Sequence, residues 1–202
     1  MKLWWFVFAM AWIMAFRPLL YKEVTIHRLI IQPTSSLTIQ GKSNLNSFQC
    51  RIMEYTGSDT LVLVEGGENE HSVFQQGFVG LSASSFDCGI KLITHDFRET
   101  IKSKEHPFVS IDFISFERAP NYSGMKEKFK GELEISIGGV TKSFEMNFTM
   151  EADDAGVVHL QGAHNFAFSD FNLEPPSKMM GLIKVEDLLT VNFHLVLQHG
   201  NS

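Results

Sequence analysis

Apolar and polar residues alternate with a period of two along most of the chain. Residues 131–148 (GELEISIGGVTKSFEMNF) show this most clearly: Leu133, Ile135 and Ile137 alternate with polar residues before a Gly-Gly pair. The alternation resumes after the glycines, where Phe144 belongs to the apolar set. A Gly-Gly pair between two alternating segments is typical of a tight turn, so the pattern predicts a β-hairpin with one apolar and one solvated face.

Similar strand patterning covers most of the remaining chain. The segments that we expect to be strands are 37–53 (a long strand bent near Gly41), 60–65, 76–86, 107–118, 128–137, 140–151, 157–168 and 184–198. About eight strands with one buried face each favour an all-β, antiparallel architecture, because antiparallel sheets can expose one face to water. The pattern fits either a sandwich or an up-and-down barrel and does not separate the two.

One segment departs from the period of two. Between residues 90 and 104, Ile93, Phe97 and Ile101 recur at helical spacing. We expect a single short helix here, which ends before Pro107 because a proline disfavours the helical conformation of the residue before it. Such a helix would plug or flank one end of the strands.

The composition indicates one ordinary domain. The chain has 202 residues, of which 44% are hydrophobic, so it can bury a core without help from metals. It contains 18 phenylalanines but only three tryptophans and three tyrosines, which favours an apolar interior. The net charge is −6 and no basic run occurs, which argues against nucleic acid as a partner.

The N-terminus resembles an export signal. Lys2 precedes an uncharged apolar stretch of 14 residues, 3–16. This stretch is too short to span a bilayer, which takes about 20 residues, and fits the apolar part of a signal peptide. We therefore expect residues 1–21 to be a signal peptide or an uncleaved apolar leader, tethered at the membrane if it is retained, and residues 22–202 to form the domain.

The two cysteines, Cys50 and Cys88, lie in segments with strand-like patterning. In an exported protein an even number of cysteines permits a disulfide, and two separate buried thiols are the alternative. The residues themselves leave these alternatives open. A zinc site is not expected, because the sequence has no CxxC pair and no histidine at ligand spacing from either cysteine.

Five segments together resemble the YceI-like family. They are LTIQGKSNLNSFQC (37–50), CGIKLITHDFRETIKSKEHPFVSIDF (88–113), the hairpin 131–148, FSDFNLEPP (168–176) and IKVEDLLTVNFHL (183–195). The order and spacing of the five segments carry the resemblance, since each one alone is mostly an alternating apolar pattern. In the fourth segment Asn172 stands where the family usually has glycine, and asparagine also tolerates a left-handed backbone.

The resemblance implies an extended, lipocalin-like, eight-stranded antiparallel barrel that is secreted to the periplasm and holds a polyisoprenoid chain in an apolar tunnel. The apolar face of the hairpin would then line this tunnel. Our interpretation of the alternating pattern predicts these tunnel residues: Val79, Leu81, Val109, Ile111, Phe113, Leu133, Ile135, Phe144, Met146, Phe148, Phe166, Phe168, Val191, Phe193 and Leu195.

No catalytic motif is present in the sequence. His95 and Asp96 form a candidate acid–base pair, but with no nucleophile in view we expect them to orient the helix. His159 and His164 are an odd number of positions apart in one strand, so they face opposite sides and cannot share a metal ion. His194 falls on the polar face of the last strand, and we expect it to be solvated.

Three hypotheses for the function follow. The first is an exported, non-enzymatic carrier of an isoprenoid, its quinone or a similar amphiphilic lipid, with no cofactor besides that lipid, no metal and no nucleic acid, and with a homodimer left open. The second is a stress-related structural barrel whose packed core leaves no room for a ligand and which acts through protein partners. The third is a small isomerase or cyclase, which would need polar groups that converge inside the barrel.

Overall fold

The computed structural model describes residues 24–52, 55, 58–67, 70–122 and 124–200. The expected leader, 1–21, lies outside the described residues. Within the described part of the chain, no helix has both the length and the apolar content that a membrane crossing requires.

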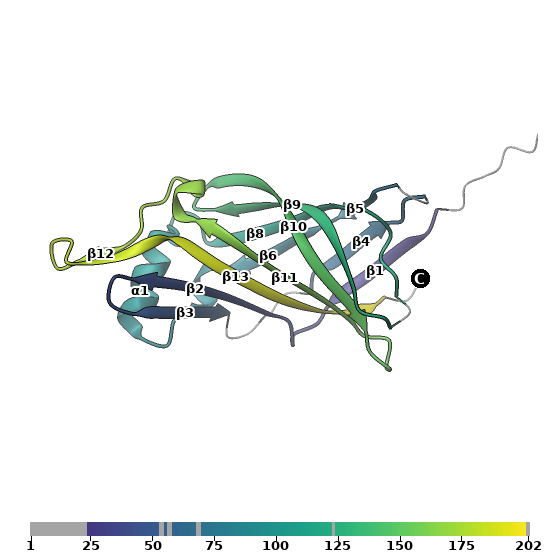
Figure 1. The fold of residues 1–202 in the computed structure, drawn as a ribbon, viewed down its shortest axis with the longest axis horizontal. Coiled ribbons are helices and arrows are strands. Elements are labelled where there is room, and N and C mark those ends of the chain that lie inside the picture. Colours follow the sequence, from purple (N-terminus) through teal and green to yellow (C-terminus); the bar gives the residue numbers. More distant parts are fainter. Residues whose placement is uncertain (1–23, 53–54, 56–57, 68–69, 123, 201–202) are drawn as a thin grey trace, which may run out of the picture.

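The described residues form a mostly antiparallel β structure with one α-helix (Figure 1). The strands are β1 (Ile26–Ile31), β2 (Ser36–Ser43), β3 (Ser47–Ile52), β4 (Thr60–Val64), β5 (Ser72–Gln76), β6 (Phe78–Ser82), β7 (Phe86–Asp87), β8 (Phe108–Phe116), β9 (Glu127–Ile137), β10 (Val140–Ala152), β11 (Val158–Ala167), β12 (Ser177–Lys178) and β13 (Ile183–His199). The helical elements are α1 (Lys91–Thr100) and the short 3-10 helices η1 (Ala83–Ser85) and η2 (Phe168–Phe171).

Among the described residues, eight strands close into a barrel in the order β1-β4-β5-β8-β9-β10-β11-β13, because β13 pairs back with β1. At the other end of the barrel the long β13 pairs instead with β2, which continues to β3 and β7, and β6 takes the place of β5 beside β8. The closed barrel decides between the sandwich and the barrel that the sequence left open. Figure 1 shows the resulting elongated shape, with α1 and β12 at one end and the β1–β4 pair towards the other.

The hairpin 131–148 is confirmed. Val140 pairs with Ile137, and Gly138 and Gly139 form the two-residue turn with φ of 57° and 85°. Positive φ at both positions is what a type I′ turn requires, and glycine adopts it without steric cost. A Cβ atom at Gly139 would also lie 2.6 Å from the His106 ring, so the turn can pack closely against the segment after α1.

The expected long strand 37–53 is wrong as a single element. The structure divides it into β2 and β3, which pair with each other as a hairpin. The turn forms at Ser43, whose Oγ accepts hydrogen bonds from the backbone N–H groups of Leu45 and Asn46. Serine and asparagine favour such local turns, a signal that the apolar alternation on either side obscured.

Two other strand assignments need correction. The expected strand 76–86 is interrupted, because β6 ends where η1 begins and the short β7 follows. Two strands of the closed barrel were not predicted: β1, before residue 37, which pairs with both β4 and β13 and closes the barrel, and β5, which falls between the predicted strands 60–65 and 76–86. The remaining predicted strands agree with β4, β8, β9, β10, β11 and β13 to within a few residues, and the predicted helix with α1.

Aromatic rings pack together inside the barrel in a group that we call the phenylalanine cluster: Phe74, Phe113, Phe116, Phe129, Phe148 and Phe193. Neighbouring rings in the cluster have centroids 4.7–6.3 Å apart. A β-bulge between Phe113 and Ser115 in β8 lets both Phe113 and Phe116 point inward. Gly162, which pairs with both Phe148 and Phe193 across adjacent strands, leaves room for the cluster, since a Cβ atom there would lie 2.3 Å from the Phe193 ring.

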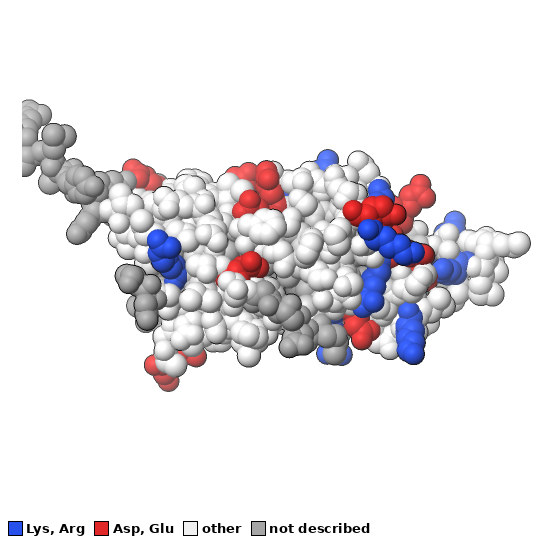
Figure 2. Space-filling view, turned by 180° about the vertical axis from the view of Figure 1, so that it is seen from behind, with Lys and Arg blue, Asp and Glu red and all other residues white. Residues whose placement is uncertain are grey.

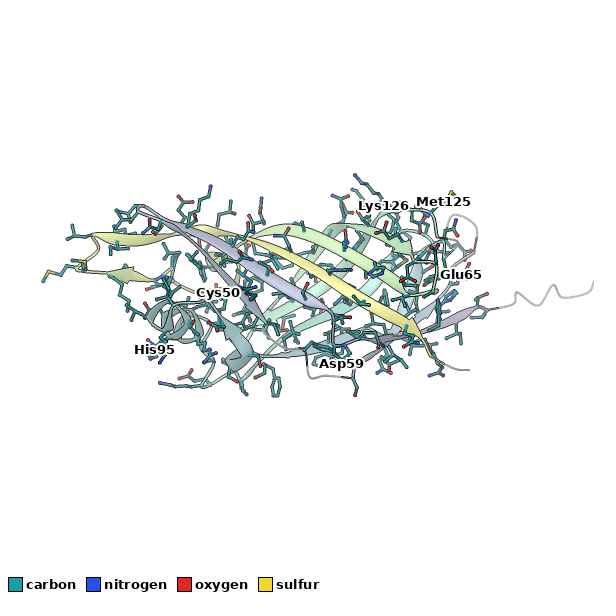
Figure 3. The ribbon with its side chains drawn as sticks, turned by 90° about the horizontal axis from the view of Figure 1, so that it is seen from below. Cys50, Asp59, Glu65, His95, Met125 and Lys126 are labelled. Carbon is teal, nitrogen blue, oxygen red and sulfur yellow. A yellow bond between two sulfur atoms is a disulfide. The ribbon has the colours of Figure 1, made fainter. Side chains whose placement is uncertain are left out.

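The opposite end is covered by α1, and a disulfide ties this region to the sheet. Cys50 in β3 is bonded to Cys88, which lies just after β7 and just before the helix. The Arg98 guanidinium donates two hydrogen bonds to the carbonyl oxygen of Phe86, at 2.7 and 3.0 Å, and the Phe86 and Phe97 rings meet edge to face. Together these contacts hold α1 against the barrel end. Figure 3 shows Cys50 and His95 in this half and Glu65 and Lys126 at the far end.

Candidate functional site

An apolar hollow of about 240 Å³ lies under α1 at the helix end of the barrel. We call it the helix-end hollow. Three parts of the chain supply its walls: the β2–β3 hairpin, the helix, and the segment from η2 to β13. Its apolar lining residues are Leu45, Phe48, Leu92, Ile93, Phe97, Phe168, Pro176, Ile183 and Val185. The walls meet here because β2 and β13 both extend past the closed part of the barrel.

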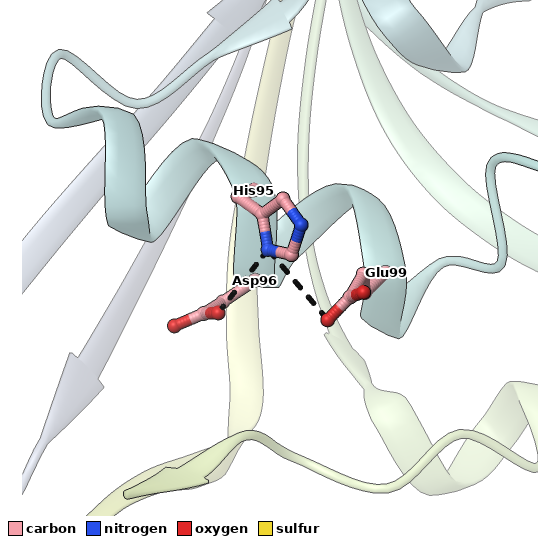
Figure 4. Close-up of side chains that lie close together, drawn as sticks. All are labelled: His95, Asp96 and Glu99. Carbon is pink, nitrogen blue, oxygen red and sulfur yellow. Dashed lines mark ion pairs between the residues drawn. The ribbon is translucent and has the colours of Figure 1, made fainter.

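The rim of the helix-end hollow carries one ion pair. Asp96 on α1 lies 2.9 Å from the ammonium group of Lys178 on β12, and both residues line the hollow. His95 lies beside them, with Nδ1 3.7 Å from Asp96 and 3.6 Å from Glu99 (Figure 4). The pair links the helix to the β12–β13 hairpin, in keeping with the orienting role expected for His95 and Asp96.

A second, smaller hollow of about 30 Å³ lies in the wall between the β2–β3 side and β6. It brings together six of the predicted tunnel residues: Val79, Leu81, Ile111, Phe113, Phe193 and Leu195. Ser35, Ser36, Leu37, Ile52 and Tyr55 complete its lining. This space can hold about one water-sized group, so it is a gap in the packing and does not form an open tunnel.

The other predicted tunnel residues also belong to the hydrophobic core. Phe168 lines the helix-end hollow, and the remaining eight line neither of the two hollows: Val109, Leu133, Ile135, Phe144, Met146, Phe148, Phe166 and Val191. They are buried or partly buried against one another. The alternating pattern therefore located the interior face of the barrel, and binding of a ligand by these residues stays a prediction.

Two polar groups of the described interior lie close to predicted tunnel residues. The Tyr55 hydroxyl donates a hydrogen bond of 2.7 Å to Asp59, and burial raises the pKa of this tyrosine above its usual range. His164 packs between the rings of Phe144 and Phe166, and burial lowers its pKa below the ordinary value of histidine. Tyr55 and Asp59 lie in the loop between β3 and β4 and His164 lies in β11, so these groups do not converge on one point as a catalytic site would require.

The outer face of the barrel holds an arrangement that corrects one expectation. His194 was expected to be a solvated histidine, but its Nε2 atom lies 2.9 Å from Nδ1 of His159 in the neighbouring strand. The two residues are diagonal neighbours, since Gln161 pairs with His194 and His159 pairs with Val196. A single-strand analysis missed the contact because it depends on the register between β11 and β13.

Most residues that line the helix-end hollow were not predicted from the sequence. Phe48, Leu92, Ile93 and Phe97 line it, but none was predicted as a binding residue. The helical spacing of Ile93 and Phe97 indicated that this side of α1 faces an apolar surface. What could not be deduced was that the β2–β3 hairpin would fold over the same space.

The fold and the apolar interior define a class: an extended, lipocalin-like antiparallel barrel closed at one end and covered by a helix at the other. No protein-family profile and no curated protein sequence matches the chain. Solved structures do match it. One is a polyisoprenoid binding domain from Saccharophagus degradans implicated in plant cell wall breakdown, with 11% identity, a TM-score of 0.63, and 87% of this chain and 100% of that chain covered.

Two further matches have the same fold. BcnA of Burkholderia cenocepacia is 16% identical with a TM-score of 0.55, over 80% of this chain and 95% of that one. The YceI protein of Campylobacter jejuni is 17% identical with a TM-score of 0.51, over 70% and 81%. At these identities the similarity concerns the fold, and it confirms the YceI-like fold expected from the sequence.

Proposed function

We propose that this protein is an exported, non-enzymatic carrier that holds an isoprenoid, a quinone or a similar amphiphilic lipid with its apolar part inside the barrel. The observation that carries the proposal is the helix-end hollow, an apolar space whose rim holds the Asp96–Lys178 ion pair. Apolar walls favour a hydrocarbon chain through burial of its surface, and rim charges favour a polar head group at the opening. The polyisoprenoid-binding relative from S. degradans supports this class of ligand.

The size of the hollow bears on how much of the ligand it can hold. Its volume of about 240 Å³ lies below the range of roughly 300–1,000 Å³ that is typical of small-molecule sites. A short chain fits the hollow as it stands. A longer chain would have to displace Phe168 and then the side chains behind it, such as Phe166. We therefore expect affinity to rise with chain length over a few isoprene units and then to level off.

Binding at the helix-end hollow can be tested with farnesol and short-chain ubiquinone analogues, using the protein purified from the periplasm without detergent. Native mass spectrometry would show any lipid that is bound on purification, and fluorescence or calorimetric titration would give the affinity. Ile93→Trp fills the hollow and should weaken binding at least tenfold. Val73→Trp, at a half-exposed position on β5 far from α1, is the matched control and should leave binding unchanged.

Two outcomes would overturn the proposal. One is a protein that carries no lipid and takes up none of these probes. The other is a protein in which Ile93→Trp and Val73→Trp bind alike, because the ligand would then lie elsewhere. Recovery of the wild-type protein outside the periplasm, with the leader intact and exposed to the cytoplasm, would separately remove the export part of the proposal.

A second candidate function is favoured by the phenylalanine cluster. Buried rings at ordinary packing distances are what a stress-related structural barrel with a packed core would show. Such a protein would act through protein partners at its surface. The lipid experiment also separates this candidate from the carrier. A packed barrel would show only the mass of the protein itself in native mass spectrometry, and neither the wild-type protein nor Ile93→Trp would bind the lipid probes.

A further inference from the structure

The outer face of the β11–β13 pair brings two imidazole rings together far from the helix-end hollow. Nδ1 of His159 and Nε2 of His194 are 2.9 Å apart, with ring centroids 5.1 Å apart and ring planes inclined by 37°. One of the two nitrogens donates the hydrogen bond and the other accepts it. The lone pairs of both nitrogens can therefore be directed into the same space once the shared proton leaves.

A carboxylate stands at the other nitrogen of His159. Asp153 Oδ2 lies 3.7 Å from His159 Nε2. The turn between β10 and β11 holds this carboxylate in place, because Asp153 Oδ1 accepts hydrogen bonds from the backbone N–H groups of Ala155, at 2.9 Å, and Val157, at 2.8 Å. These bonds fix the carboxylate beside the His159 ring.

This arrangement favours one tautomer of His159. An ionised carboxylate near Nε2 stabilises the proton on Nε2, which leaves the Nδ1 lone pair free to accept from His194 or from a cation. A carboxylate on the far nitrogen is the usual device that orients a metal-binding histidine and increases its basicity. His194 offers its Nε2 atom to the same space, 2.9 Å from His159 Nδ1.

We propose that His159 Nδ1 and His194 Nε2 together bind one divalent transition-metal ion, with zinc as the reference ion, and that Asp153 positions His159 for it. Two nitrogens that are each 2.0–2.1 Å from a tetrahedral zinc ion lie about 3.3 Å apart, so the rings need to separate by only a few tenths of an ångström. On binding, the proton between the rings moves to His194 Nδ1 or to solvent. Water fills the remaining positions, since the His159 side chain is 25% exposed and reachable from outside.

The surrounding charge suits a cation. Glu151 pairs directly opposite His159 on β10, and its charge acts on His194. The Lys126 ammonium group lies 4.0 Å from the Glu151 carboxylate and is paired with it. The site thus offers two imidazole nitrogens as donors, with two carboxylates near them, and nitrogen donors suit zinc and copper better than magnesium.

A second group of possible ligands, His95, Asp96 and Glu99 on α1, is the natural rival within the described residues (Figure 4). Lys178 already lies 2.9 Å from Asp96 there, so a metal ion would have to displace an ammonium group. That group also supplies one imidazole rather than two, which makes it a weaker site for zinc. A variant in this second group, H95Q, therefore serves as the control in the experiment.

The test is a calorimetric titration of the metal-free full chain with Zn²⁺, with ¹H–¹⁵N spectra of the histidine side chains. The wild-type protein should bind one ion, with shifts at His159 and His194. H159Q and H194Q should each lower the affinity at least tenfold, and D153N should lower it by a smaller factor, within the roughly 10–100-fold seen when the partner of a ligand histidine is removed. H95Q and H71Q should bind as the wild type does.

Loss of binding in H95Q, with H159Q unaffected, would overturn the proposal in favour of the α1 group. Binding too weak to saturate at millimolar zinc would also overturn it and would leave the histidine pair as a cross-strand hydrogen bond. Circular dichroism of each variant shows whether a loss of binding reflects misfolding. The site lies outside the barrel and does not depend on the proposed lipid, so the two proposals stand or fall separately.

Discussion

The interior of the barrel is filled in different ways at its two ends. At the closed end, where β1 and β13 complete the sheet, large rings such as Phe116 and Phe148 fill the interior and are almost fully buried. At the helix end no strand pair closes the sheet, and α1 with the β2–β3 and β12–β13 hairpins covers an apolar hollow instead. One end is therefore built for stability, and the other retains apolar surface that is not fully packed.

The two ends also differ in the distribution of charged side chains. On the face shown in Figure 2, Lys and Arg side chains concentrate towards the end that carries α1 and β12, interspersed with acidic residues, and form no continuous basic stripe. Met179, Met180 and Leu182, in the turn between β12 and β13, are exposed beside them. Apolar and charged side chains thus lie side by side at the end that carries the helix-end hollow.

The largest expected effect comes from breaking the closed end. Phe148 is 1% exposed and contacts four other rings of the phenylalanine cluster. Phe148→Ala should lower the free energy of unfolding by about 3–5 kcal/mol, because it removes a buried ring and leaves a cavity. Chemical denaturation monitored by fluorescence or circular dichroism would measure the change.

The comparison needs the same substitution at the other end. Phe48 lines the helix-end hollow and is only partly buried, so Phe48→Ala should cost less than half as much as Phe148→Ala. Equal losses for the two variants would mean that the helix end is as tightly packed as the closed end. In that case the proposal of a lipid carrier would lose its main support, which is the incompletely packed hollow at the helix end.

The disulfide gives the next effect, and it concerns the helix end. Cys50 and Cys88 are 38 positions apart, and a loop of this length corresponds to about 3–4 kcal/mol of stability in the chain-entropy description. The double variant Cys50→Ala with Cys88→Ala should lose about that much, and α1 should exchange its amide hydrogens faster than β9. Uniform acceleration throughout the barrel would contradict this local role.

The sequence predicted which residues along the main strands face inward, and little of how separate segments meet at either end of the barrel, and the reason is physical. The alternation in β9, β10, β11 and β13 reports directly which side chains face inward, since the period of a strand is two. Leu133, Phe148 and Phe193 were placed in the interior from that pattern alone, and they are buried there. Asn172 was expected to accept a left-handed backbone and does so, with φ of 53°.

The hollow and the histidine pair depend on how segments distant in the sequence meet. The turn at Ser43 folds β3 back over β2 and brings Phe48 towards α1. The contact between His159 and His194 exists because Val158 pairs with Leu197, and a shift of one residue would abolish it. Neither the position of Phe48 near α1 nor the contact between His159 and His194 can be deduced from the periodicity of a single segment.

Acidification should affect the interior more gently than these substitutions. The pKa of His164 lies below the ordinary value of about 6.5, mainly because its ring is partly buried against Phe144 and Phe166. As the pH falls below about 6.5, the unfolded chain binds a proton before the folded chain does, so this contribution to stability is complete above that pH and is lost below it.

We therefore expect the wild-type protein to lose stability between pH 7.5 and 5.5, and His164→Leu to lose less. His194 and His199 also have lowered pKa values and act in the same direction, so His164→Leu should reduce the loss without abolishing it. Asp87 and Asp153, whose pKa values are lowered, titrate below this window. Denaturation curves in the presence of EDTA, which keeps metal ions out, would check the prediction, and a steeper loss in the variant would refute it.

Removal of the rim ion pair should have the smallest effect on stability. It is also the most direct test of whether the helix end, unlike the closed end, is a binding site. The Lys178 side chain is 48% exposed, so its pair with Asp96 is worth about 0–1 kcal/mol. Lys178→Gln should leave unfolding almost unchanged but weaken the binding of a fatty carboxylate severalfold relative to the corresponding alcohol, because only the carboxylate gains from the cation at the rim. Lys184→Gln, at the position paired with Ser177 across the same hairpin, is the matched control. If both variants discriminate between the two lipids as the wild type does, the head group does not lie at this rim, and the helix end would be a gap in the packing rather than the mouth of a binding site.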